Sequence, residues 1–219
     1  MGGRGPMRII ASEDDIAEGL SALARRDRRL HKVIRLAGPV PLRRRTAGFA
    51  GLARIVIGQQ VSIASAEAIW TRFTNAFPDC PVDVIEAASD ESLRAPGLSA
   101  AKAKTLRAIA AACRGGGLDL VGLAGLPAED AHRRLTAVKG VGPWTADIYL
   151  LFCLGHADIF PAGDLALRNA VADAFRRPVP LPVDEMIDIA AKWSPWRGVA
   201  ARLFWAYYRV RRDRTALPV

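Results

Sequence analysis

The first residue able to do chemistry is an aspartate that follows a short segment containing glycine and proline. Residues 160–164 read Phe-Pro-Ala-Gly-Asp, and the apolar residues after Asp164 are spaced as in a helix. A carboxylate at a helix start can cap the first turn, which contributes about 1 kcal/mol to stability. Taken by itself, the segment favours the cap, and a chemical role for Asp164 depends on a second pattern in the chain.

A second pattern, 22 residues upstream of Asp164, suits contact with a phosphate backbone. Residues 135–146 read Leu-Thr-Ala-Val-Lys-Gly-Val-Gly-Pro-Trp-Thr-Ala: a helix end, a glycine pair and a new helix start. Gly140 and Gly142 let the main chain approach another surface closely, and the amides of the next helix start suit a phosphate. This indicates a helix-hairpin-helix motif, which contacts DNA phosphates without reading base sequence. An ordinary helix–helix turn is the alternative.

Taken together, the hairpin and the downstream aspartate resemble the HhH-GPD superfamily of base-excision DNA glycosylases. That name refers to a hairpin, a Gly/Pro-rich loop and a catalytic Asp. Within the superfamily the chain is most similar to the alkylation-repair branch, DNA-3-methyladenine glycosylase II, over roughly residues 45–210. Five collinear segments carry the resemblance: 57–62 (Ile-Gly-Gln-Gln-Val-Ser), 97–103, 140–146, 160–168 and 195–205.

The resemblance implies that Asp164 is the catalytic residue. Its carboxylate would stabilise oxocarbenium character on the sugar and orient or deprotonate the attacking water. In the bifunctional glycosylase/lyases of the superfamily, a Schiff-base lysine stands where this chain has Trp144, and Lys139 does not match that position. The resemblance thus implies a monofunctional hydrolase without AP-lyase activity. Its partner would be double-stranded DNA carrying alkylated purines, chiefly 3-methyladenine and 7-methylguanine, reached by base flipping.

The resemblance also assigns residues to the flipped base and to the gap that it leaves. Trp144 and Trp205 would form an aromatic pocket that attracts a cationic purine by stacking and cation–π interaction, with Tyr149 as a weaker candidate. Burial of either tryptophan in the core is the alternative. Gln60 would be the wedge that fills the vacancy in the duplex, with an ordinary loop as the alternative.

The remaining expected contacts follow from the same family pattern. DNA binding would involve six further residues: Gln59, Gly140, Val141, Gly142, Thr145 and Arg168. The hairpin would hold a structural Na+ or K+ at three backbone carbonyls, those of Thr136, Val138 and Val141. No cofactor would be required.

Helical periodicity without period-2 runs predicts an all-α fold of about ten short helices. The expected arrangement is two interleaved helical subdomains with a cleft between them. Residues 1–45 would pack with the C-terminal helices, and 46–157 would form a subdomain that contains the hairpin at about 127–154. Residues 158–219 would carry Asp164 and complete the second subdomain. About 45 residues precede the matched region, which predicts a compact form without the N-terminal β-domain of longer bacterial relatives.

Composition narrows the class of partner. Lys and Arg number 31 against 22 Asp and Glu, a net charge of +9, which favours nucleic acid, although a preference for arginine codons would also raise it. Cys80, Cys113 and Cys153 are too few for an iron–sulfur cluster and fit a reducing compartment. The start lacks a secretory signal, and no apolar run approaches the ~18 residues of a membrane span. We therefore expect a cytoplasmic monomer without membrane contact, nucleoid-associated if bacterial.

Two other functions stay open at this point. One is a glycosylase for another damaged or mismatched base, and the other is a non-catalytic helix-hairpin-helix DNA-binding protein. The match of Asp164 and the two pocket tryptophans argue against the second. A release assay on methylated DNA separates all three functions.

Overall fold

The computed structural model describes residues 8–215, and the prediction of an all-α fold is confirmed for them: they form twelve α-helices and no strand. The chain divides into two compact units. Unit 1 comprises Met1–Arg44 and Gly155–Val219, and unit 2 comprises Arg45–Leu154. These boundaries lie within three residues of the expected ones at 45/46 and 157/158. Unit 2 is thus one continuous segment, whereas unit 1 is assembled from the two ends of the chain.

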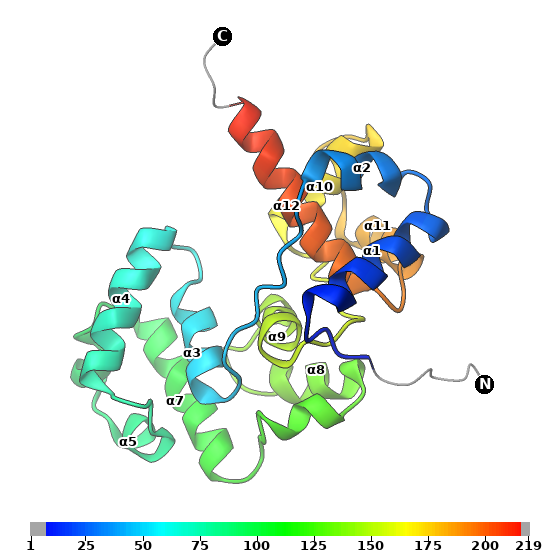
Figure 1. Cartoon of the computed structure of the whole chain (residues 1–219). Coiled ribbons are helices and arrows are strands. Elements are labelled where there is room, and N and C mark those ends of the chain that lie inside the picture. Colours follow the sequence, from blue (N-terminus) through cyan, green and yellow to red (C-terminus); the bar gives the residue numbers. More distant parts are fainter. Residues whose placement is uncertain (1–7, 216–219) are drawn as a thin grey trace. The chain divides into compact units, whose positions relative to one another are not determined.

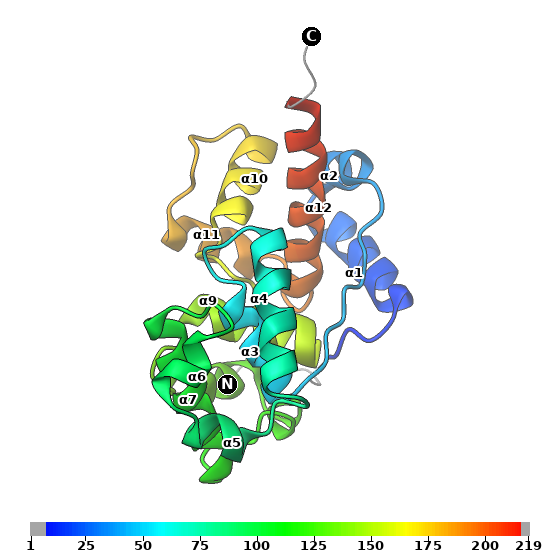
Figure 2. The ribbon, with the colours of Figure 1, turned by 90° about the vertical axis from the view of Figure 1, so that its left-hand side faces the viewer.

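Unit 2 is built around α3 (Phe49–Ile57), which packs against α4 (Ile63–Ala76), α7 (Ala100–Arg114) and α9 (Pro143–Tyr149) (Figure 2). Seven of the nine residues of α3 are buried, so most of the helix surface is apolar. The remaining helices of the unit surround this core: α5 (Val82–Ala87), α6 (Asp90–Arg94), the 3-10 helix η1 (Gly122–Gly125), α8 (Ala128–Thr136) and the π-helix η2 (Leu150–Leu154).

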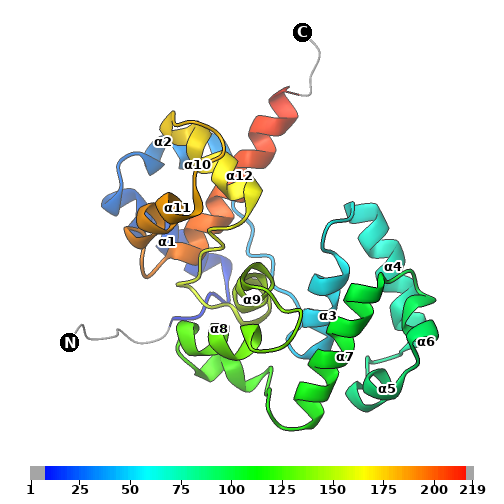
Figure 3. The same ribbon diagram turned by 180° about the vertical axis from the view of Figure 1, so that it is seen from behind.

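Unit 1 is organised around α12 (Arg197–Thr215), against which the other four helices of the unit pack (Figures 1 and 3). These are α1 (Glu13–Arg26), α2 (Leu30–Ala37), α10 (Leu165–Phe175) and α11 (Val183–Ala191). Trp193 and Phe204, both fully buried, stack in its core with ring centroids 5.2 Å apart. The N-terminal and C-terminal segments of unit 1 are linked by a hydrogen bond from the amide of Ile10 to the carbonyl of Gly155, at 2.7 Å.

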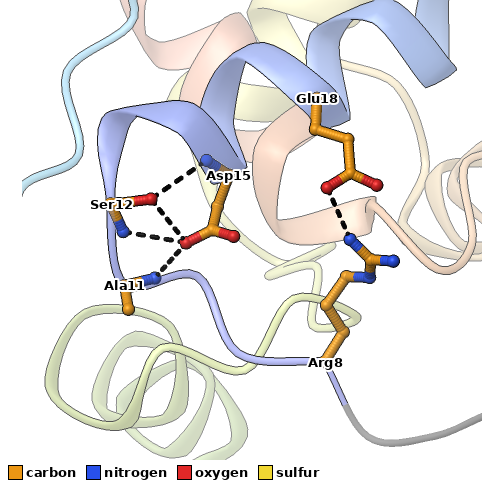
Figure 4. Close-up of polar contacts among 5 residues, drawn as sticks. All are labelled: Arg8, Ala11, Ser12, Asp15 and Glu18. Carbon is orange, nitrogen blue, oxygen red and sulfur yellow. Dashed lines mark hydrogen bonds and ion pairs between the residues drawn. The ribbon is translucent and has the colours of Figure 1, made fainter.

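The start of α1 explains why its position is readable from sequence (Figure 4). The Asp15 carboxylate accepts hydrogen bonds from the amides of Ala11 and Ser12, both at 2.9 Å, while the Ser12 hydroxyl accepts from the amide of Asp15. This is a capping box. The two backbone bonds, with the Ser12 hydroxyl, hold the pKa of Asp15 below its ordinary value, because they favour the charged form.

Other helices begin without such a signal. Gly48 precedes α3 and Pro127 precedes α8, and neither residue makes a side-chain cap hydrogen bond. The helices α2 and α6 are the hardest to predict from sequence. The first begins after Arg29 without a side-chain cap, and the second has only five residues, too few for a periodic pattern. None of the helices within residues 8–215 has the length and apolar character that crossing a membrane requires.

Candidate active site

The hairpin of unit 2 joins α8 to α9, and its two glycines have different reasons to be there. Gly140 has φ +91°, and a Cβ at this position would collide with the Thr105 side chain of α7. Gly142 caps α9 at φ −84°, a value open to any residue, and a Cβ there would meet no atom within 4 Å. Folding thus requires glycine at position 140, while nothing inside unit 2 requires it at position 142.

A cavity of about 560 Å³ lies beside the hairpin within unit 2. It is lined by Gly58 and by six residues singled out from the sequence: Gln59, Gln60, Gly140, Gly142, Trp144 and Thr145. Trp144 keeps 36% of its surface exposed, so it is not the buried plug that the alternative interpretation required. The volume falls in the range of small-molecule and cofactor sites. Gln60, the two hairpin glycines and Trp144 are therefore brought together around one cavity.

The turn between α3 and α4 carries Gln60 at its tip. Gln60 is exposed, and its backbone adopts the left-handed conformation at φ +55°. This conformation is unfavourable in free energy for a residue other than glycine. The side chain of Gln59 instead contacts α9, where its amide donates to the buried Thr145 hydroxyl at 2.6 Å. After the tip, Ile63 is 85% exposed at the start of α4. The turn and the start of α4 thus present the polar Gln60 and the apolar Val61 and Ile63 to solvent.

One contact at this turn was not foreseen. The Lys102 ammonium, on α7, donates to the carbonyls of Ile57 and Gln59, each at 2.8 Å, and burial lowers the pKa of Lys102 from its ordinary value. In the sequence, Lys102 is one member of the matching segment 97–103, and nothing in the local pattern indicates a role for it.

In unit 1 the carboxylate of Asp164 is the N-cap of α10 and touches Trp205. Its Oδ1 accepts from the amide of Leu167 at 3.0 Å and from the indole Nε1 of Trp205 on α12 at 3.2 Å. Asp164 and Trp205 are both half-buried. The cap that was one alternative for Asp164 is therefore present. Trp205 was predicted as a wall of the base pocket, and this role stays a prediction. The structure shows that its indole orients the Asp164 carboxylate.

Two expected site residues are placed differently. Tyr149, predicted for the base pocket, is fully buried in the core of unit 2. Its hydroxyl donates to the carbonyl of Leu120 and accepts from the amide of Gly48, and burial raises its pKa. The side chain of Val141, predicted at the DNA surface, is 4% exposed, and its amide donates to the carbonyl of Val138. The prediction of Tyr149 as a pocket residue is wrong, because its ring and hydroxyl are used in packing.

Two further predictions concern residues with a structural contact that sequence did not indicate. Arg168 on α10 donates through Nε to the carbonyl of Leu181, which ties the proline-containing segment 178–182 to the helix. A DNA contact from the rest of its guanidinium stays a prediction. The carbonyls of Thr136 and Val138 lie at and just beyond the C-terminal end of α8, and that of Val138 accepts one amide. A carbonyl has a second lone pair, so neutral oxygens there fit a hard monovalent cation, which also stays a prediction.

Known proteins share sequence with this chain. The family model for HhH-GPD superfamily base excision DNA repair proteins matches residues 53–193. DNA-3-methyladenine glycosylase 1 of Schizosaccharomyces pombe is 31% identical over 201 residues, which cover 90% of this chain and 88% of that protein.

Two solved structures extend the agreement to the fold. The S. pombe 3-methyladenine DNA glycosylase in complex with abasic DNA has a TM-score of 0.78 at 29% identity, over 86% of this chain and 95% of that one. DNA-3-methyladenine glycosidase of Bacillus halodurans has a TM-score of 0.78 at 27% identity, over 94% and 95%. The hairpin, the wedge turn and the capped aspartate thus stand in a chain that belongs to the HhH-GPD superfamily of base excision DNA repair proteins.

Proposed function

We propose that the protein is a monofunctional DNA glycosylase of the DNA-3-methyladenine glycosylase II type. It would hydrolyse the N-glycosidic bond of alkylated purines, 3-methyladenine and 7-methylguanine, in duplex DNA. The observation that carries this proposal is the Asp164 carboxylate, held by two N–H donors in a member of a base-excision repair superfamily. The names of the S. pombe and B. halodurans relatives support the substrate class.

DNA binding begins at the hairpin. A Cβ at position 142 would meet open space, so a closely approaching phosphate backbone would explain the glycine there. The net charge of +9 adds a sequence-independent attraction to the same polyanion. Both features favour binding of any duplex before a lesion is found.

Extrusion of the damaged nucleotide then needs something to fill its place. Flipping costs a few kcal/mol of unstacking and unpairing, least for a damaged or mispaired base. Gln60, exposed at the tip of its turn, is the side chain that would enter the stack, where its amide can hydrogen-bond the orphaned partner base. The indole of Trp144, which lines the neighbouring cavity, would stack on the base.

The chemical step follows from the charge of the substrate. An alkylated purine such as 7-methylguanine is cationic, so it leaves as a neutral base with the electrons of the glycosidic bond. Positive charge then develops on the sugar, and the Asp164 carboxylate stabilises it. Water adds to the anomeric carbon and loses a proton to the carboxylate or to solvent. The N–H groups of Leu167 and Trp205 hold the carboxylate in one orientation for both events.

The absence of a lyase step is part of the proposal. A β-lyase of this superfamily uses a lysine amine to form a Schiff base with the sugar. Trp144 stands at that position here, and an indole nitrogen cannot form the adduct. The proposed products are therefore the free base and an intact strand with an abasic site.

Incubation of the protein with N-methylated duplex DNA tests the whole proposal. We expect free 3-methyladenine and 7-methylguanine, an uncleaved abasic strand, and no covalent protein–DNA adduct after borohydride treatment. Release of an oxidised or mismatched base alone would favour a different glycosylase. Duplex binding without release of any base would identify a non-catalytic DNA-binding protein.

A further inference from the structure

Lys102 occupies an unusual position beside the turn that carries Gln60. Its ammonium donates to the carbonyls of Ile57, the last residue of α3, and Gln59, each at 2.8 Å. The last carbonyls of a helix have no partner within the helix, and a cation near them is stabilised by the negative end of the helix dipole. Hydrogen bonds from a charged donor are roughly twice as strong as neutral ones. The lysine thus fastens the end of α3 and the first part of the turn to α7.

The turn needs such fastening because its tip is strained. Gln60 has φ +55°, and a non-glycine residue in the left-handed region costs roughly 1–2 kcal/mol. Gln59, directly before it, is held twice, since its carbonyl accepts from Lys102 and its side-chain amide donates to Thr145. With residue 59 anchored in this way, the side chain of residue 60 is directed outward.

The structure therefore assigns to Lys102, through its bonds to the carbonyls of Ile57 and Gln59, the role of a positioning residue that holds the Gln60 wedge ready to enter the duplex. This inference rests on the proposed function and deepens it. Lys102 would touch neither the base nor the sugar, because its ammonium is directed at two main-chain carbonyls. Its removal should therefore hinder extrusion of the nucleotide and leave the cleavage of the glycosidic bond unchanged.

The test compares Lys102→Met with Lys104→Met, which removes the same charge from an exposed position of α7. Release of 7-methylguanine is measured in single turnover with saturating enzyme, with the lesion paired to cytosine or mispaired to thymine. Because mispairing lowers the cost of flipping, Lys102→Met should slow release about tenfold in the paired duplex and about twofold or less in the mispaired one. Lys104→Met should match the wild type on both duplexes.

A double-mutant cycle with Gln60→Ala separates positioning of the wedge from general damage. If Lys102 acts through Gln60, adding Lys102→Met to Gln60→Ala should slow release by less than about twofold further, since coupled positions are not additive. Lys102→Arg, which keeps charge and donors, should recover most of the rate. Circular dichroism and thermal unfolding of each variant establish that it is folded. If Lys102→Met does not fold, the comparison is made with Lys102→Gln.

Three results would overturn the inference: equal slowing in paired and mispaired duplexes, independent effects of the Lys102 and Gln60 substitutions, or a borohydride-trapped adduct on Lys102. If the wild-type protein releases no base, the proposed function fails instead. Nucleotide extrusion is then followed by the fluorescence of 2-aminopurine next to the lesion. A signal change that Lys102→Met and Gln60→Ala both abolish would keep the positioning role, and a signal unaffected by Lys102→Met would refute it.

Discussion

The two units hold their functional side chains by different means. In unit 2, Gln60, Trp144 and Gly142 stand on a turn and a hairpin, and they are exposed or line an open cavity. In unit 1, Asp164 is fixed by a helix cap and by an indole 41 residues further along the chain. A surface that meets DNA needs accessible main chain and side chains, whereas a carboxylate that acts in a transition state needs a single orientation. Under the proposed function, this contrast assigns binding and extrusion to unit 2 and chemistry to unit 1.

The largest effect should come from removing the charge of Asp164. Asp164→Asn should slow release of 7-methylguanine by more than about a hundredfold, because the charge that it stabilises exists only in the transition state. Asparagine also caps helices well, so thermal stability should be kept. Binding to undamaged duplex should be unchanged as well. Near-wild-type release by a folded Asn variant would show that Asp164 has no part in the mechanism. It would also contradict the assignment of the chemistry to unit 1.

Trp205→Phe tests the orientation of that carboxylate while leaving an aromatic ring in place. The loss of one hydrogen bond to a charged group, about 1.5–3 kcal/mol, should slow release about tenfold or more at saturating enzyme. Trp70→Phe is a matched control, because Trp70 is half-buried on α4 and stacks on Phe73 in unit 2. If the two substitutions have the same effect, the bond from Trp205 to Asp164 has no part in the chemistry.

Within unit 2, the wedge and the pocket should respond differently to the lesion. Gln60→Ala should slow release of cationic 7-methylguanine and neutral hypoxanthine by a similar factor, about tenfold, since a wedge offsets the cost of flipping for any base. Trp144→Ala should slow release of the cationic base more, because cation–π attraction depends on its charge. The measurement is the single-turnover release rate of each lesion by each variant. If Gln60→Ala changes the ratio of the two rates and Trp144→Ala does not, the roles of wedge and pocket are assigned to the wrong residues.

The two hairpin glycines offer a smaller and sharper contrast. Gly142→Ala should weaken binding to undamaged duplex about fivefold, or about 1 kcal/mol, without a loss of stability, because its Cβ meets open space. Gly140→Ala should instead destabilise the fold by at least about 1 kcal/mol, since φ +91° and the Thr105 side chain oppose a Cβ. Calorimetry and binding titrations measure both. Unchanged binding of Gly142→Ala would contradict a close approach of DNA at this residue.

The smallest effect concerns the α1 cap of unit 1. Asp15→Ala should lower the free energy of unfolding by about 1 kcal/mol and leave base release unchanged. Asp14→Ala, which removes another first-turn charge of α1, should lower it by only about 0.3 kcal/mol. Because the folded-state pKa of Asp15 is lowered, its contribution is present at neutral pH. This contribution begins to decrease as the pH falls below the unfolded-state pKa of about 4, and it is lost as the pH falls through the lowered pKa of the folded state. Urea unfolding at pH 7 and pH 2.5 checks this, and a difference that persists in acid would rule the cap out as its source.

Much of this protein can be read from local sequence. Helical spacing and caps such as Ser12 and Ser99 predict most helices, because capping and periodicity act within a few residues. The hairpin, the wedge turn and Asp164 are also recognisable, since each is a short motif whose residue types matter individually. The resemblance aligns Trp144 with the Schiff-base lysine of the lyases, and that an indole cannot form a Schiff base follows from this residue type alone.

Only the tertiary structure decided which side chains are buried and which form hydrogen bonds with one another. Tyr149 and Trp144 are both aromatic residues on α9, yet one is sealed in the core and the other lines a cavity, a difference made by helices distant in sequence. The bonds from Trp205 to Asp164 and from Lys102 to the Gln60 turn span 41 and 43 or more residues. Sequence patterns report contacts within a helix turn or a loop. Hydrogen bonds between separate helices depend on how the whole core packs.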